Sequence, residues 1–288
     1  MRATEIDLSF LRRWPLPELR EDESKEDRGR VLIVAGSREV PGAALLAGRA
    51  ALRVGAGKLH VATAADVAPA VAIAMPEARV SGLPTTPAGE ISDLSDAALA
   101  AAGSSAAVLS GPGMEVSETT VNVARALASR ARAVVFDAAA ISAASRGTCV
   151  ITPHFGEMAR LCDCSKEAIE RAPDAIAIEV ARDRGVVVAL KSATTYVATP
   201  HGALWVHRGG SIGLGTSGSG DVLAGLIAGL IAQGAAADQA AVWAVVLHGS
   251  AGTALSARMG LVGYLAREIA DEIPALRERS RHGAGRTG

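Results

Sequence analysis

The chain has 288 residues and a formal net charge of −1, because 29 Lys and Arg side chains nearly balance 30 Asp and Glu side chains. That length suits one sizeable α/β domain, and the balanced charge excludes a general positive field for nucleic acid or an anionic membrane. The longest apolar run, residues 222–232, is far shorter than a bilayer span, and the first residues carry acids where a signal peptide is apolar. We therefore expect a soluble, cytoplasmic protein that binds neither nucleic acid nor membrane.

Predicted strands and helices alternate along most of the chain. Residues 31–35, VLIVA, form a continuous β-branched run, which is typical of a strand buried on both faces. Further strands are expected at residues 58–62, 106–110, 133–136, 148–151, 186–190, 194–198 and 203–207, the last two as a hairpin. Helices are expected at residues 43–54, near 92–102, and at residues 119–131, 157–162, 175–184, 222–232 and 237–258, with a last helix through residue 276. This βαβ order predicts an α/β fold.

The two ends of the chain depart from this pattern. Residues 1–28 carry charges of both signs and two prolines, so we expect a surface arm with at most one short helix. Residues 29–278 are expected to form a single catalytic domain. Residues 279–288 are expected to be a disordered tail.

Loops that follow the predicted strands carry candidate functional residues. Gly111 and Gly113 follow the strand at 106–110, and their amides would lie at the carboxyl edge of the sheet, where open α/β folds bind ligands. An ordinary tight turn is the alternative. His154 also follows a strand, although a histidine is more often a satisfied core or surface residue. Lys191 could pair with a phosphate oxygen or could be a solvated loop lysine.

The first such loop does not form a Walker site. Gly36 and Gly42 flank a loop of about P-loop length, but Ala43 follows Gly42 where that motif needs lysine.

Residues 211–234, SIGLGTSGSGDVLAGLIAGLIAQG, are the most informative stretch of the chain. Gly213, Gly215, Gly218 and Gly220 permit positive φ, so the amides of residues 216–221 can turn toward one point. The following helix is apolar on every face, which predicts burial, and its N-terminus adds free N–H groups and partial positive charge. Together these features predict a phosphate site.

Asp221 is the one acid at this predicted phosphate site. A carboxylate beside a phosphate is repelled unless the chemistry needs a base or a metal ligand there, and we interpret Asp221 as the catalytic base. A plain N-cap role for Asp221 is the competing interpretation. A Rossmann fingerprint is rejected, although Gly213, Gly215 and Gly218 match GxGxxG, because that motif needs a strand after the helix and residues 235–288 look helical and then disordered.

Six sequence blocks, in one order, resemble the bacterial ADP-dependent NAD(P)H-hydrate dehydratases of the ribokinase-like superfamily. The resemblance runs from about residue 25 to about residue 260. The blocks are GRVLIVAGS (29–37), PGAALLAGRAALRVGAGKLHVAT (41–63), SGPGM (110–114), ITPHFGEMARL (151–161), VVVALKSATTYVAT (186–199) and GTSGSGDVLAGLIAGLIAQG (215–234).

The resemblance implies a three-layer α/β/α sandwich with a mostly parallel sheet. It also implies a repair reaction in which the hydrated form of NADH or NADPH is dehydrated while ADP is split to AMP and phosphate, with Mg²⁺ as a helper and a homotetramer as the assembly. By position in the family motifs, the residues at the hydrated dinucleotide would be Ala43, Gly111, Gly113, His154 and Asp221. Those at the nucleotide would be Lys191, Ser192, Ala193, Thr194, Thr195, Gly218, Ser219 and Gly220.

The chain departs from the family pattern in three loops. The family's Asp-Ala-Asp-Ala-Leu is residues 137–141 here, DAAAI, with Ala139 in place of the second acid. Ser211 and Ile212 replace an Asn-Pro pair, Ser217 replaces the first of two glycines, and residues 38–40 lack a common tyrosine. Asp221 and its neighbouring amides are unchanged.

Two other functions remain open from the sequence. A small-molecule kinase of the same superfamily, acting on a hydroxymethylpyrimidine or a hydroxyethylthiazole, would share the Gly-x-Gly-Asp chemistry. A catalytically weak relative that binds nucleotide as a sensor or scaffold is the third possibility, because of Ala139.

Overall fold

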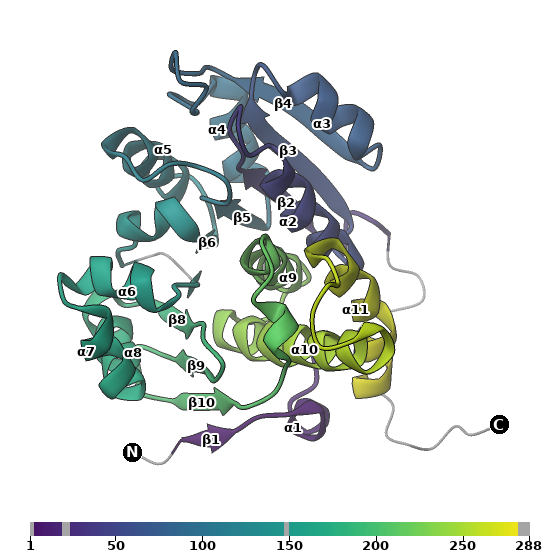
Figure 1. The fold of residues 1–288 in the computed structure, drawn as a ribbon. Helices are drawn as coiled ribbons and strands as arrows, with labels where there is room; N and C mark the ends of the chain where they lie inside the picture. Colours follow the sequence, from purple (N-terminus) through teal and green to yellow (C-terminus); the bar gives the residue numbers. More distant parts are fainter. Residues whose placement is uncertain (1–2, 19–23, 147–149, 282–288) are drawn as a thin grey trace.

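The computed structural model describes residues 3–18, 24–146 and 150–281. Two of the residues predicted as strand, 148 and 149, lie outside this range, as do residues 282–288 of the predicted tail. Within the described residues, one sheet runs through the molecule with helices on both faces (Figure 1). The predicted α/β fold with a mostly parallel sheet is confirmed.

The sheet has ten strands in the described part of the chain, in the order β1-β10-β9-β8-β7-β6-β5-β2-β3-β4. From β4 to β8 neighbouring strands are parallel, whereas β9 is antiparallel to both β8 and β10. The expected hairpin is therefore β9 and β10. The strands are β1 Thr4–Glu5, β2 Arg30–Val34, β3 Lys58–Ala64, β4 Ala78–Leu83, β5 Ala107–Ser110, β6 Val134–Phe136, β7 Val150–Ile151, β8 Val187–Leu190, β9 Thr195–Ala198 and β10 Leu204–His207.

The helices form two layers against this sheet. They are α1 Leu8–Arg13, α2 Gly42–Arg53, α3 Ala68–Ala74, α4 Asp96–Ser104, α5 Glu118–Ala128, α6 Phe155–Cys162, α7 Lys166–Arg171, α8 Pro173–Arg184, α9 Ser219–Ala232, α10 Ala237–Met259 and α11 Ala266–Arg281. Two 3₁₀ segments, η1 Ala138–Ala143 and η2 Ile212–Leu214, lie in loops. The sequence did not predict α7 or the 3₁₀ segments.

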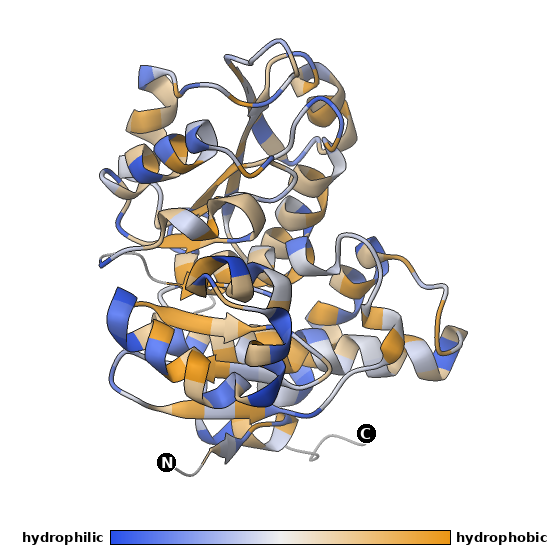
Figure 2. Ribbon diagram, turned by 60° about the vertical axis from the view of Figure 1, so that its left-hand side comes forward, coloured by the Kyte–Doolittle hydropathy of each residue, from blue (hydrophilic) through white to orange (hydrophobic). Residues whose placement is uncertain are grey.

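Alternation along each strand divides the core between the two faces of the sheet. Val31 and Ile33 of β2 pack in the cluster that contains α2, α9 and α10, whereas Leu32 and Val34 pack with α4 and α5. Successive side chains of a strand point to opposite faces, so one apolar run serves both layers. Figure 2 shows the sheet strands as largely hydrophobic and the outer helices as mixed in hydropathy.

Helix α9 is buried on nearly every side, as its sequence predicted. A Cβ atom added at Gly225 would lie 2.2 Å from the carbonyl oxygen of Ala47, and one at Gly229 would lie 2.8 Å from that of Ala51. Glycine is therefore required for α9 to approach α2 this closely.

One helix of the described residues, α10, is long and apolar enough to cross a membrane by length and composition. Polar residues interrupt its sequence, so α10 contains no long continuous apolar run. Because 67% of its apolar window is buried inside the protein, we interpret α10 as a core helix.

The N-terminal segment is part of the fold, and the expectation of a surface arm was wrong for its first half. β1 adds a strand at the edge of the sheet by pairing in parallel with β10. Ile6 and Leu11 are buried, and Trp14 stacks on Trp205 with ring centroids 5.4 Å apart. These apolar side chains anchor a segment whose overall charge suggested exposure. At the other end, α11 continues to Arg281, past the predicted start of the tail.

Candidate active site

Three loops meet at the carboxyl edge of the parallel strands. The amide of Gly36, after β2, donates to the carbonyl of Pro112, after β5, over 2.8 Å. Gly113 has φ +65°, and a Cβ there would lie 2.7 Å from the Cβ of Ala43 at the start of α2. A Cβ at Gly111 would meet the carbonyl oxygen of Asp137, after β6, at 1.9 Å. The structure therefore brings together the predicted residues Ala43, Gly111 and Gly113.

The glycine-rich loop leads into α9, which begins at Ser219, three residues earlier than predicted. Gly218 is its N-cap with φ +85°, and no side chain caps this helix. Asp221 is thus in the first turn of the helix, where the backbone N–H groups have no acceptor within the helix. A Cβ added at Gly218 would lie 2.3 Å from Leu46 and 3.7 Å from Asp221 Oδ2, so the loop packs closely between α2 and the acid.

Only part of this loop can offer its amides to a ligand. The amide of Gly213 donates to Ser211 Oγ, that of Gly215 to the carbonyl of Ile212, and that of Ser219 to the carbonyl of Thr216. The expectation that all amides of residues 216–221 turn toward one point was therefore too broad. The amides of Gly220 and Asp221 lie in the first turn of α9 and are the candidate donors for an anion.

Lys191 bridges the two parts of this edge. Its Nζ donates to Asp137 Oδ1 over 2.7 Å, and a Cβ added at Gly220 would lie 3.1 Å from the same Nζ. Thr152 Oγ1 also donates to Asp137 Oδ1. Asp137 is 2% exposed, so the interpretation of Lys191 as a solvated loop lysine was wrong: it is the partner of a buried acid and lies against the N-terminus of α9.

The surroundings of Asp221 raise the pKa of its carboxyl group. Burial and the neighbouring Asp137 carboxylate raise the pKa of Asp221 to about 7, with a smaller contribution from Glu157, while Lys191 lowers it. Burial lowers the pKa of Lys191, but the three carboxylates Asp137, Glu157 and Asp221 raise it by more than burial lowers it. The pKa of Lys191 is therefore raised overall. A carboxyl group with a pKa near neutrality, beside free helix amides, suits general base catalysis.

His154 has a structural role that the sequence analysis missed. Its Nδ1 accepts the amides of Gly156 (2.9 Å) and Glu157 (3.2 Å), while Glu157 Oε2 accepts the amide of His154 (2.8 Å). These contacts form a capping box at the start of α6. The histidine side chain is still 56% exposed, and its backbone is paired with that of Lys191. The cap therefore fixes an exposed imidazole beside the site.

The remaining predicted nucleotide residues form the turn between β8 and β9 and the first turn of α9. Thr194 N donates to Ser192 Oγ over 3.2 Å, and Thr195 begins β9. Ser192 and Ala193 are exposed. Ser219 Oγ lies 3.0 Å from Nε2 of His248 on α10.

His248 and Thr152 are polar residues of this region that the sequence analysis missed. Burial lowers the pKa of His248 to about 4, so its ring is neutral. His248 lies in none of the six sequence blocks, and Thr152 lies in the 151–161 block but was not singled out there. Only the fold brings His248 to Ser219 and Thr152 to Asp137.

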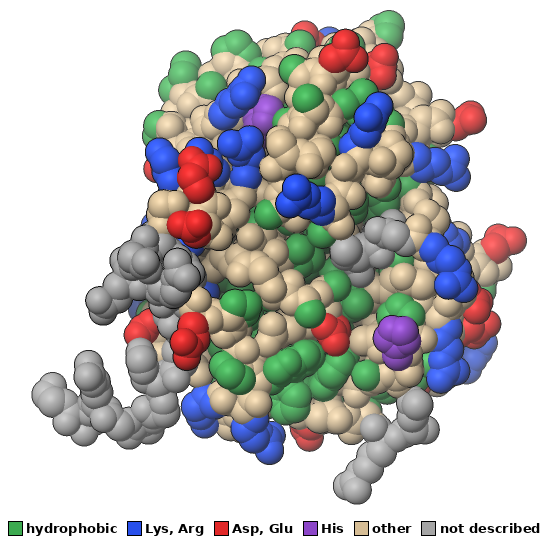
Figure 3. Space-filling model, turned by 180° about the vertical axis from the view of Figure 1, so that it is seen from behind, with side chains coloured by type: hydrophobic (Ala, Val, Ile, Leu, Met, Phe, Trp, Pro, Cys, Tyr) green, Lys and Arg blue, Asp and Glu red, His purple; other side chains and the backbone are tan. Residues whose placement is uncertain are grey.

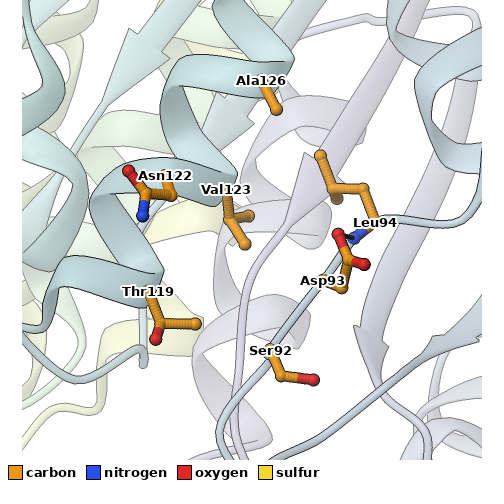
Figure 4. A pocket seen from close by; sticks show the side chains of 7 residues that line it. All are labelled: Ser92, Asp93, Leu94, Thr119, Asn122, Val123 and Ala126. Carbon is orange, nitrogen blue, oxygen red and sulfur yellow. Dashed lines mark hydrogen bonds between the residues drawn. The ribbon is translucent and has the colours of Figure 1, made fainter.

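A cavity between the 92–94 segment and α5 lacks such chemistry (Figure 4). It measures about 360 Å³ and is lined by Ser92, Asp93, Leu94, Thr119, Asn122, Val123 and Ala126. Its one acid, Asp93, accepts the amide of Leu94. No cationic side chain lines this cavity, so the carboxyl edge around Asp221 is the stronger candidate site.

The fold, an α/β sandwich with a Gly-x-Gly-Asp helix start at the carboxyl edge of its sheet, is ribokinase-like by comparison with solved structures. A solved ribokinase-like superfamily protein from Enterococcus faecalis superposes with a TM-score of 0.81 at 24% identity and covers 96% of each chain, which confirms the predicted fold class. The family model for NAD(P)H-hydrate dehydratases matches residues 31–275. This chain belongs to that family.

Two relatives support the assignment. The ADP-dependent (S)-NAD(P)H-hydrate dehydratase of Xanthomonas campestris is 50% identical over 283 residues, which are 96% of this chain and 97% of that protein. The crystal structure of the ADP/ATP-dependent NAD(P)H-hydrate dehydratase from Bacillus subtilis, co-crystallised with ATP and Mg²⁺, has a TM-score of 0.83 at 27% identity and covers 97% of this chain and 99% of that one. The family and enzyme class predicted from the six blocks are confirmed.

Proposed function

We propose that this chain repairs nicotinamide nucleotides by dehydrating hydrated NADH or NADPH at the expense of ADP, with NAD(P)H, AMP and phosphate as products. The observation that carries the mechanism is Asp221, a carboxyl group with a pKa of about 7 placed in the first turn of a helix whose amides are free. Family membership supports the substrate class.

The first step is phosphoryl transfer. Asp221 accepts the proton of the hydroxyl group on the hydrated ring, and the hydroxyl oxygen attacks the terminal phosphorus of ADP, so that AMP leaves. The amides of Gly220 and Asp221 hold the phosphoryl oxygens, and Lys191 supplies a positive charge against the same helix end. In-line transfer of this kind depends on positioning and on charge stabilisation more than on covalent catalysis.

The second step is elimination. The lone pair of the ring nitrogen expels the new phosphate ester as inorganic phosphate, and loss of a proton from the neighbouring carbon restores the ring double bond. Phosphorylation thus converts hydroxide, a poor leaving group, into phosphate. The atoms balance: hydrate and ADP give NAD(P)H, AMP and phosphate.

The remaining contacts follow from the loops. We assign the hydrated dinucleotide to the surface near Ala43, Gly111, Gly113 and His154, because the first three are packed together and His154 is exposed beside Lys191. We assign the AMP portion to the 191–195 turn and to residues 218–220. Lys191 connects the two groups.

The described residues do not fit a resident metal site, because no three His, Cys, Asp or Glu side chains among them are grouped to hold an ion. We propose that Mg²⁺ enters with the phosphates of ADP as part of the substrate, and no step above is assigned to it. We also propose that the enzyme acts in the cytoplasm, as a homotetramer.

The test is an assay with the purified protein, ADP and hydrated NADPH. We expect the absorbance of the reduced nicotinamide to return, with one AMP and one phosphate formed per molecule repaired, and no return without ADP. A parallel reaction with ATP and hydroxymethylpyrimidine or hydroxyethylthiazole should give no phosphorylated alcohol. Phosphorylation of an alcohol without hydrate repair would establish a kinase instead, and nucleotide binding without any turnover would establish a sensor.

A further inference from the structure

The amino ends of the strands carry a second cavity, at the opposite edge of the sheet from Asp221. Its volume is about 750 Å³, which is within the range of small-molecule sites. Its lining residues come from β2, β3, β4, α4 and the adjoining segments: Lys25, Arg30, Gly57, Lys58, Leu59, His60, Glu77, Arg79, Ala97, Ala100, Ala101 and Ser104.

Strand register places the cations of this cavity side by side. Arg30 of β2 is paired with Lys58 of β3, and His60 of β3 is paired with Arg79 of β4. Lys58 and His60 are two residues apart and point to the same face, as directly paired residues also do. Three neighbouring strands therefore each contribute a cationic side chain on the face that α4 covers.

Helix α4 leaves room above these cations. The side chains it presents to the cavity are Ala97, Ala100, Ala101 and Ser104, all small. Further along the same face, Leu32 and Val34 of β2 pack against Ala98 and Ala102 of this helix in a closed core. The contact between α4 and the sheet is thus apolar and closely packed around Leu32 and Val34, whereas at the amino edge it is lined by cations and contains the cavity.

The charges in the cavity are unbalanced. Four lining residues, Lys25, Arg30, Lys58 and Arg79, are cationic, and Glu77 is the one acid among them. Lys58 also pairs with Glu26. His60 is 4% exposed, and burial together with the charges of Arg79 and Arg30 lowers its pKa to about 4. In Figure 3, Lys and Arg side chains lie around a histidine at the upper left of the rear face, with Asp and Glu side chains beside some of them.

We propose that this cavity binds a small anion with two or more phosphate charges, namely inorganic diphosphate or the diphosphate group of a nucleotide. Two arginines and two lysines fit phosphate oxygens through charge-assisted hydrogen bonds. Among the described residues, no Phe, Tyr or Trp lines the cavity, and the ring of His60 is buried, so recognition rests on the phosphates. Arg30 and Val34 are the two ends of β2, about 13 Å apart, and the loops of the candidate active site lie beyond Val34, so the cavity and the active site are separate.

The experiment is a titration of the isotopically labelled full chain, followed by the NMR signals of the Lys58 and Leu59 amides and the His60 ring. Inorganic diphosphate should shift these signals saturably and raise the pKa of His60. Because each signal is local, nucleotide binding at Asp221 is distinguished from binding here, and no turnover is needed. A second titration with ADP separates inorganic diphosphate from the diphosphate group of a nucleotide. The ligand that shifts these signals at the lower concentration is the one that the cavity prefers. Citrate binding as tightly as diphosphate would overturn the assignment to phosphates.

Variants on both walls of the cavity test the location. Arg79→Gln, at an exposed position, should weaken diphosphate binding by about tenfold or more. Ala100→Glu, at an exposed helix position that tolerates Glu, should abolish it by adding a negative charge. Arg182→Gln, an equal charge change on exposed α8, is the control and should leave the affinity unchanged. No saturable shift in the wild-type protein, or equal shifts in Ala100→Glu, would refute the site.

Discussion

The two phosphate sites that we propose lie at the two edges of one sheet and would hold the anion with different groups. At the carboxyl edge, the proposed donors are backbone amides of α9, and the side chains nearby are three carboxylates and one cation, Lys191. At the amino edge, the donors are cationic side chains with one acid among the lining residues. Amides carry no net charge, so they can hold an anion while a carboxylate with a raised pKa remains beside it. Side-chain cations also hold an anion, but they would lower the pKa of a neighbouring carboxyl group and so make it a weaker base.

The largest effect that this comparison predicts is on turnover at the carboxyl edge. Asp221→Asn keeps the shape of the helix start and removes the base, so kcat should fall by about 10² to 10⁴ while ADP still binds. The control is Asp238→Asn, because Asp238 occupies the first turn of the next helix, α10, and is remote from the proposed chemistry. Steady-state kinetics and equilibrium binding of ADP measure both. Equal kcat values for the two variants would remove Asp221 from the mechanism.

The second effect concerns stability at the same edge. Lys191→Met leaves Asp137, which is 2% exposed, without its cationic partner, and the free energy of unfolding should fall by about 3–5 kcal/mol. The matched control is Lys166→Met, which removes an exposed pair with Glu170 and should cost less than about 1 kcal/mol. Denaturant unfolding measures both. The double variant Asp137→Asn/Lys191→Met should recover part of the loss, because the buried charge is gone.

The contrast between these lysines also shows what could be predicted from sequence. β-branched runs and glycine turns are local patterns, so most strands and helices were predicted within a few residues. The pairing of Lys191 with Asp137 spans 54 positions and depends on the order of β6, β7 and β8, which no local pattern encodes. For the same reason, the sequence could identify Asp221 as a base but not the carboxylates that raise its pKa.

Short or hidden elements mark the other limit of sequence reasoning. β1 has two residues and is stabilised by pairing with β10, some 200 positions away. Its own sequence carries no strand pattern, so the charged residues around it led to the prediction of a surface arm. The amides of Gly213 and Gly215 are used by η2 and its caps, which glycine spacing alone does not reveal. The amino-edge cavity was not predicted because its cations are scattered along the chain and meet only through strand register.

The third prediction is a pH dependence of the carboxyl edge. Burial and the charge of Asp137 raise the pKa of Asp221 to about 7, so kcat/KM should rise with pH and reach half of its plateau near pH 7. A carboxyl group with a raised pKa binds its proton more tightly in the folded state. Its contribution to stability is therefore complete below the unfolded pKa and is lost as pH rises through about 7.

The direction of this change of stability with pH gives an independent check on the pKa of Asp221. Asp221→Asn should be more stable than the wild-type protein above pH 7, and the difference should shrink to nothing as the pH falls toward 4, because asparagine resembles the protonated acid. Unfolding curves across this range measure it. A stability difference that does not change with pH would show that the carboxyl group has an ordinary pKa.

The smallest effect separates the two edges by their response to salt. The amino-edge cations are partly exposed, so added salt screens them, and the affinity for diphosphate should fall steadily between low and physiological ionic strength. At the carboxyl edge, the donors are neutral amides of a half-buried helix end, so the affinity for ADP should change less over the same range. NMR titrations at two NaCl concentrations, with matched counter-ions and pH, measure both in one sample. Equal slopes would mean that side-chain charge, and not the helix amides, dominates binding at both edges, and the distinction between the two edges would then be wrong.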